Sequence, residues 1–207
     1  PFFLGSFVCF FFQTNGLFAQ KKSLPFTPID TIAVQDSTLF ESKGSIATVI
    51  MFICNHCPFV KHVNNELVML SNELLEKNIG VIGINSNDSS QEKYAEDSFD
   101  KMQEYALELG YKFPYVVDED QKAAKEFTAQ CTPDFFLFDN TQSLVYRGQL
   151  DNSRPGNDQP VTGDSLRSAV EAMLSGQGPL QTQLPSMGCN IKWRINEEPD
   201  YFLKLKN

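Results

Sequence analysis

The first twenty residues of the chain contain no Asp, Glu, Lys or Arg, although they hold seven of its eighteen phenylalanines. An apolar run from Phe2 to Phe12 leads through a polar break to Ala19 and then to Lys21-Lys22. The run is shorter than the roughly 20 apolar residues that a membrane-spanning helix needs. The pattern is typical of a secretory signal peptide, so we expect residues 1–20 to be one, with its start truncated, and the protein to be exported to a periplasmic or extracellular location. An uncleaved membrane anchor is the alternative.

The sequence also lacks a long basic run. Its 17 basic and 26 acidic residues give a net charge of −9. Nucleic-acid binding requires a concentrated positive surface, so we expect no nucleic-acid partner. A hydrophobic content of 42% with 21% charged residues excludes wholesale disorder, a collagen and a polytopic membrane protein. We therefore expect one soluble, monomeric domain of ordinary size that is not stably inserted in a membrane after the signal is cleaved.

Apolar periodicity predicts an α/β fold. Runs at 46–53 and 79–84 are continuous, apolar and rich in β-branched residues, which indicates strands that are buried on both faces. Between them an apolar stripe at steps of three and four residues, from Val60 to Leu74, predicts an amphipathic helix. Strand, helix and strand with short joints form a βαβ unit, in which the strands are parallel.

The rest of the chain extends this unit. The patterns predict, in order, a strand near 32–34, a helix over 99–109, a strand at 115–117, a short helix near 123–127, a hairpin of 135–138 with 144–147, and a helix from Asp164. We expect a layered domain with a central mixed β-sheet flanked by helices over residues 21–176. A C-terminal tail, 177–207, is expected to pack on that domain.

Four cysteines remain outside the leader: Cys54, Cys57, Cys131 and Cys189. The first two form Cys54-Asn55-His56-Cys57-Pro58, between the first buried strand and the amphipathic helix. A thiol at a helix N-terminus is favoured as the thiolate, because unpaired N–H groups and the helix dipole stabilise the charge. We expect Cys54 to attack a partner disulfide, Cys57 to resolve the mixed disulfide, and His56 to lower the pKa of the Cys54 thiol.

Two other interpretations of this pair are open. A CxxC also begins many zinc sites, but those need a second pair of ligands, and no further CxxC or HxxxH occurs in the sequence. A copper or zinc carrier is therefore the weaker alternative, and an inert structural disulfide is another. We expect no metal and no cofactor in the redox interpretation.

Cys131-Thr132-Pro133 directly precedes the predicted hairpin. With this segment the chain resembles the thioredoxin-like superfamily, in which a cis-proline loop faces the CxxC and helps to bind the partner's backbone. The resemblance implies that Thr132 and Pro133, together with Asn55, bind the substrate. Motifs at 54–61, 132–139, 146–149 and 188–193 are similar to the peroxiredoxin-like proteins related to AhpC/TSA, and this similarity covers about residues 30–195.

The resemblance raises a thiol-dependent peroxidase, an antioxidant enzyme, as the main alternative. In true peroxiredoxins a Thr or Ser lies three residues before the peroxidatic cysteine, and an Arg from a later strand assists it. Cys54 and Pro133 stand at those two positions here, so thiol-disulfide exchange with protein or small-molecule partners is favoured over peroxide reduction. Arg147 is a candidate substitute for the missing arginine. Cys131 and Cys189 are candidates for additional redox thiols.

Overall fold

The computed structural model of the chain describes residues 44–204. The expected signal peptide and the strand expected near 32–34 lie outside the described residues. In chain order the first elements are β1 (Ala47–Phe52), α3 (Pro58–Glu76), β2 (Ile79–Asn85), the short 3₁₀ helix η1 (Glu92–Asp97), α4 (Phe99–Leu109) and β3 (Tyr115–Val117). They are followed by α5 (Lys122–Glu126), β4 (Cys131–Thr132), β5 (Asp134–Asp139), β6 (Leu144–Gly148), α6 (Asp164–Leu174), β7 (Cys189–Asn190) and α7 (Asp200–Leu203).

The expected mixed sheet is confirmed. Five strands lie in the order β3-β2-β1-β5-β6, and β4 pairs with β7 in a separate two-stranded sheet. β1 runs parallel to β2, with Ala47 opposite Ile79, as the βαβ pattern predicts. β5 is antiparallel to β1 and forms the expected hairpin with β6.

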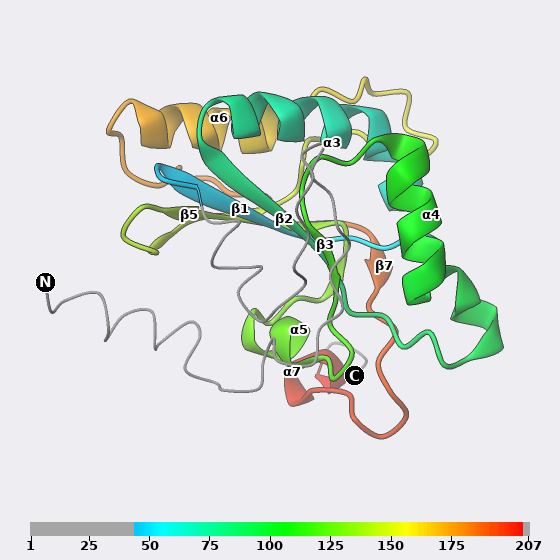
Figure 1. The fold of residues 1–207 in the computed structure, drawn as a ribbon. Helices are drawn as coiled ribbons and strands as arrows, with labels where there is room; N and C mark the ends of the chain where they lie inside the picture. Colours follow the sequence, from blue (N-terminus) through cyan, green and yellow to red (C-terminus); the bar gives the residue numbers. More distant parts are fainter. Residues whose placement is uncertain (1–43, 205–207) are drawn as a thin grey trace, which may run out of the picture.

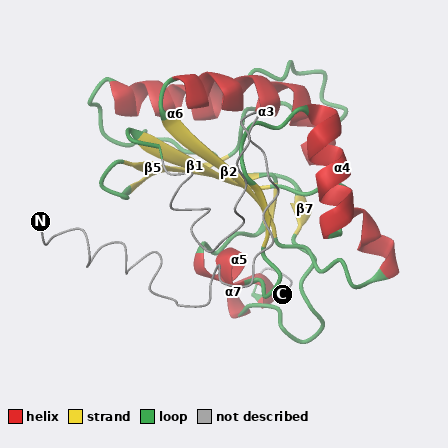
Figure 2. Ribbon diagram, in the orientation of Figure 1, coloured by secondary structure: helices red, strands yellow, loops and turns green. Residues whose placement is uncertain are grey.

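Helices cover both faces of this sheet (Figure 1), so the molecule has three layers, which Figure 2 shows as yellow strands between red helices. The alternation of side chains along β1 explains the layers, because successive residues of a strand point to opposite faces. Val49 and Met51 pack in the core beneath α3 and α6. Ile50 and Phe52 pack in a second core on the opposite face, which also contains Trp193 and Phe202 of the C-terminal tail.

The helix α3 forms where its apolar stripe predicts. Its buried residues include Val60, Val63, Leu67, Leu70 and Leu74, and Pro58 occupies its first turn, where a missing N–H costs little. α4 ends at Gly110, whose φ of +69° suits a residue without a side chain. No helix among residues 44–204 combines the length and the apolar character that a membrane crossing requires.

Candidate active site

The CxxC lies between β1 and α3, as expected. Cys54 follows the end of β1 by two residues, and Cys57 is the N-cap residue of α3. Both side chains are fully buried, and both cysteines are free thiols. The carboxyl end of a buried strand thus delivers the pair to the amino end of a long helix.

Several polar groups act on the Cys57 sulfur. It interacts with the Cys54 side chain, with the side chain and main chain of Cys189, and with the main chain of Val60 in the first turn of α3. Led by the bond with Cys54, and against the effect of burial, these interactions lower the pKa of Cys57 to about 4. The carbonyl oxygen of Thr132, 3.1 Å from this sulfur, accepts a bond from the protonated thiol and counts against the thiolate. On balance these interactions favour the thiolate on Cys57 over a thiolate on Cys54.

Cys54 has the opposite environment. Burial, the bond with Cys57 and the negative charge of Asp97 raise the pKa of Cys54 well above that of an ordinary thiol. The Thr132 hydroxyl, 3.2 Å from the Cys54 sulfur, only partly offsets this. The directions of the two pKa shifts are opposite to the sequence-based expectation: they favour the thiolate on Cys57, chiefly through its interaction with the Cys54 thiol.

His56 lies beside Cys54, but a buried carboxylate holds it there. Its Nδ1 is 3.8 Å from the Cys54 sulfur and 2.5 Å from Oδ2 of Asp97, whose side chain is fully buried. Asp97 also accepts bonds from the backbone N–H groups of Asn55 and His56 and from the amide of Asn87. Burial opposes its charge, but these bonds, with that of His56 foremost, lower the pKa of Asp97.

The sequence patterns did not point to Asp97. One signal could have found it. Parallel strands end at the same edge of a sheet, so the loop after β2 must pass close to the CxxC that follows β1. An acidic residue in that loop, such as Asp97 at the end of η1, was therefore a candidate neighbour of His56.

The Asn55 side chain is turned into the protein. It is buried, with Nδ2 donating to the carbonyl of Glu96 at 2.8 Å and Oδ1 accepting from the Tyr115 hydroxyl at 3.1 Å. Both ends of the amide are thus occupied inside the protein. This corrects the expected substrate-binding role: Asn55 fixes the CxxC loop to η1 and to β3.

The Thr132-Pro133 peptide bond is cis, and Thr132 touches both cysteines of the pair. The loop thus faces the CxxC, as the resemblance implies. Its edge is occupied by the protein itself, because β7 pairs with β4 and sets Cys189 opposite Thr132. Gly188 packs so closely that an added Cβ would lie 2.0 Å from the Thr132 carbonyl oxygen. Residues 188–190 therefore lie along the edge expected to bind a partner.

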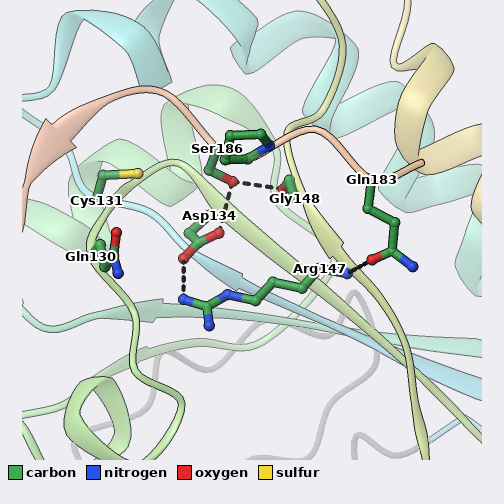
Figure 3. Close-up of a pocket in the computed structure, with 8 residues that line it drawn as sticks. Gln130, Cys131, Asp134, Arg147, Gly148, Gln183 and Ser186 are labelled. Carbon is green, nitrogen blue, oxygen red and sulfur yellow. Dashed lines mark hydrogen bonds and ion pairs between the residues drawn. The ribbon is translucent and has the colours of Figure 1, made fainter. Parts of the chain in front are cut away.

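The two further cysteines have different positions. Cys189 is partly exposed and interacts with Cys57, and burial, followed by its bond with Cys57, raises its pKa to about 11. Cys131 is buried and lines a cavity of about 260 Å³ on β5 and β6 with Asp134 and Arg147 (Figure 3). Burial, followed by the charge of Asp134, raises the pKa of Cys131 to about 12.

Arg147 belongs to that cavity. Its guanidinium donates to the side chain and carbonyl of Thr128 and lies 3.6 Å from Asp134, as Figure 3 shows for the aspartate. Among the described residues its hydrogen bonds go to Thr128 and Gln183 rather than to the CxxC. The structure therefore gives no support to Arg147 as a substitute for the missing peroxidase arginine.

Among residues 44–204, one group of side chains could hold a metal. Cys54, His56 and Asp97 each present a ligand atom, and these atoms lie within 4.8 Å of one another. Both oxygens of Asp97 already accept several hydrogen bonds, and the second histidine, His62, is bonded to Ser153. The arrangement is thus that of a carboxylate that orients a histidine beside a thiol.

Comparisons with known proteins place this site in a family. Residues 19–147 match the model of the AhpC/TSA family. An uncharacterized conserved protein from Geobacillus kaustophilus has 50% identity and a TM-score of 0.73, over 86% of this chain and 94% of that one. A hypothetical protein from Sinorhizobium meliloti has 41% identity and the same TM-score, over 85% and 92% of the two chains.

A more distant structure identifies the fold. A thioredoxin-like protein in its oxidized form has 19% identity and a TM-score of 0.51, over 65% of this chain and 82% of that one. No curated protein matches. The chain therefore belongs to the AhpC/TSA family, with a thioredoxin-like fold and a thiol-based redox function.

Proposed function

We propose that the protein is an exported, monomeric thiol-disulfide oxidoreductase whose Cys54–Cys57 pair cycles between dithiol and disulfide. The observation that carries the proposal is the position of two free thiols between β1 and the N-terminus of α3, where Thr132 of the cis Thr132-Pro133 loop contacts both sulfurs. A stabilised thiolate beside a thiol of high pKa is a pair that can attack a disulfide and then close on itself. Export rests on the pattern of residues 1–20.

The reaction uses the two sulfurs in sequence. The Cys57 thiolate attacks one sulfur of a partner disulfide, a mixed disulfide forms, and the other partner sulfur leaves as a thiolate. Cys54 then loses its proton and attacks the Cys57 sulfur, which releases the partner as a second thiolate and leaves the Cys54–Cys57 disulfide. The leaving partner thiolate takes up that proton, because Nδ1 of His56, 3.8 Å from the Cys54 sulfur, already donates to Asp97.

The partner is a protein or a small molecule that carries a disulfide or a pair of thiols. Pro133 and Thr132 supply the surface opposite the CxxC where its backbone would lie, once residues 188–190 have moved from that edge. Peroxide is the weaker substrate, because Cys54 replaces the expected Thr and Arg147 is bonded to Thr128.

Reduction of insulin by dithiothreitol, followed as turbidity, tests the proposal. Wild type should accelerate the reaction, Cys54→Ser and Cys57→Ser should abolish the acceleration, and Cys131→Ser, which changes a thiol outside the pair, should retain it. Retained turnover in Cys54→Ser or Cys57→Ser would overturn the proposal. Thiol-dependent consumption of hydrogen peroxide far faster than by free thiol would assign the protein to the peroxidases instead.

A further inference from the structure

The C-terminal segment 186–190 crosses the redox pair at close range. Ser186 anchors it on one side, donating to Asp134 and contacting the carbonyl oxygen of Gly148, each at 2.7 Å (Figure 3). Gly188 then packs on the Thr132 carbonyl, and Cys189 pairs in β-register with Thr132. Thr132 is the residue whose side chain and carbonyl touch Cys54 and Cys57.

This register brings a third sulfur to the pair. The side chain and the main chain of Cys189 both interact with the Cys57 sulfur. Cys54 and Cys57 are fully buried, whereas Cys189 is partly exposed, so it is the described cysteine of this cluster that solvent reaches. A partner disulfide thus meets Cys189 before it can meet the pair.

We propose that Cys189 is a third redox thiol, which forms a reversible disulfide with Cys57 and transfers oxidation between an external disulfide and the buried Cys54–Cys57 pair. The proposal rests on the proposed function, because it concerns how that same pair is reached. Two observations carry it: the pairing of Cys189 with Thr132, and the difference in exposure between Cys189 and the CxxC.

Each step exchanges one sulfur for another. Cys189, whose pKa is raised, first gives its proton to solvent and then attacks a partner disulfide, forming a mixed disulfide and releasing one partner thiolate. The Cys57 thiolate attacks the Cys189 sulfur, which forms Cys57–Cys189 and releases the second partner thiolate. Cys54 loses its proton and attacks the Cys57 sulfur, which forms Cys54–Cys57, and Cys189 leaves as a thiolate that takes up a proton. The partner gains two electrons and the protein ends with one disulfide.

Cys131 has no such place. Its thiol is 3.7 Å from the carbonyl oxygen of Pro133, and its side chain lines the cavity with Asp134 and Arg147. It stands opposite Asn190 rather than Cys189 in the β4–β7 pair. It therefore serves as the matched control for Cys189.

Peptide mapping tests the proposal. Cys54→Ser is equilibrated in a glutathione buffer, alkylated and digested with trypsin, which cuts the chain into 44–61 with Cys57, 126–147 with Cys131 and 168–192 with Cys189. We expect a reversible disulfide between peptides 44–61 and 168–192, and none that includes 126–147. The same link should appear in Cys54→Ala, a second variant without the resolving thiol, which covers any folding defect of Cys54→Ser. Its absence from both proteins would overturn the inference.

A pair of glycine substitutions tests the geometry without removing a sulfur. Gly188→Ala, in the Cys54→Ser background, should lose the Cys57–Cys189 link, because its Cβ has no room against Thr132. Gly178→Ala should keep it, since nothing lies within 4 Å of the added atom. Equal yields of the Cys57–Cys189 disulfide in the two glycine variants would contradict the docked position of β7. Insulin turnover by wild type without any such link would leave the proposed function standing and overturn the relay alone, whereas absence of turnover would overturn the proposed function.

Discussion

Asp97 and His56 come from segments 41 residues apart, and Oδ2 of Asp97 lies 2.5 Å from Nδ1 of His56. The same carboxylate accepts the backbone N–H groups of Asn55 and His56. One buried anion therefore fixes both the main chain of the CxxC and the ring that lies beside Cys54. The loop after β2 determines in this way how the loop after β1 presents its sulfurs.

Replacing Asp97 by Asn should destabilise the protein. The amide would present an NH₂ group to donors that now meet an oxygen, and a buried donor left unpaired costs about 1–3 kcal/mol. Urea denaturation of the reduced protein measures the loss. Glu108→Gln, which makes the same chemical change at an exposed position of α4, is the control. Equal stability of the two variants would contradict the role given to Asp97.

The pH dependence of stability has a definite sign at this residue. The pKa of Asp97 is lower in the folded protein than in the unfolded chain. Its contribution to the free energy of unfolding is therefore complete above the unfolded-state pKa of about 4, and it is lost as pH falls through the folded-state pKa. The difference in stability between wild type and Asp97→Asn should therefore shrink as the pH is lowered below about 4. A difference that grows with acidity would reverse the assignment.

The Cys57 thiolate should be visible directly. Its absorbance at 240 nm in the reduced protein should persist at neutral pH and disappear as pH falls through about 4. Cys57→Ser should lack this transition. Because the bond with Cys54 is the largest cause of the low pKa, Cys54→Ala should move the transition toward the roughly 8.5 of a free cysteine, while Cys54→Ser, which keeps a donor, should move it less. A transition unchanged in Cys54→Ala would show that other donors dominate.

A stabilised thiolate also sets the redox potential. The interactions at Cys57 favour the reduced pair, and stabilising the reduced form makes a CxxC protein more oxidising. Proteins with this motif span roughly −270 to −120 mV, and we expect a value in the upper half of that range. Equilibration with glutathione, with the disulfide quantified by alkylation, measures it. A value near the reducing end would mean that the disulfide is stabilised more than the thiolate.

Far from the sulfurs, Arg167 of α6 joins two acidic residues of α3. Its Nη2 is 2.6 Å from Oε1 of Glu66, and its Nη1 is 2.5 Å from Oε2 of Glu73. Arg167→Met would leave Glu66, whose side chain is 8% exposed, without this partner and should lower the free energy of unfolding by about 1–3 kcal/mol.

Lys61→Met is the control for Arg167. It breaks a pair with Glu96 in which both side chains are largely exposed, so the effect should stay below about 1 kcal/mol. Urea denaturation of both variants gives the comparison. A loss in Arg167→Met no larger than that in Lys61→Met would contradict the contribution assigned to Arg167.

Local pattern was sufficient to predict most of the fold. The eight-residue apolar run that contains β1, the stripe along α3 and Gly110 after α4 each report burial or a helix end within a few residues, so these elements lie where they were expected. η1 was not predicted, because residues 92–97 are mostly exposed and carry no apolar period.

The site was less predictable because its decisive contacts join distant segments. The CxxC and the Thr132-Pro133 loop could be placed from the sequence, since each adjoins a predicted element. The choice between Cys54 and Cys57 as thiolate could not, because it depends on donors from Cys189 and on the charge of Asp97. β7 has two residues, and its position follows from pairing with β4 rather than from any period of its own.

Trp193 and Phe202 are buried in the second core, so the C-terminal segment stays attached to the domain, which an external partner does not. Ser186 holds it on one side of Cys189 and Trp193 on the other, so the thiol is tethered at both ends. A tethered group competes at an effective concentration that is of millimolar order for short flexible connections and is independent of dilution. Solution thiols must exceed that concentration to displace Cys189 from Cys57, which makes the protein selective for partners that bind it rather than for those that are merely abundant.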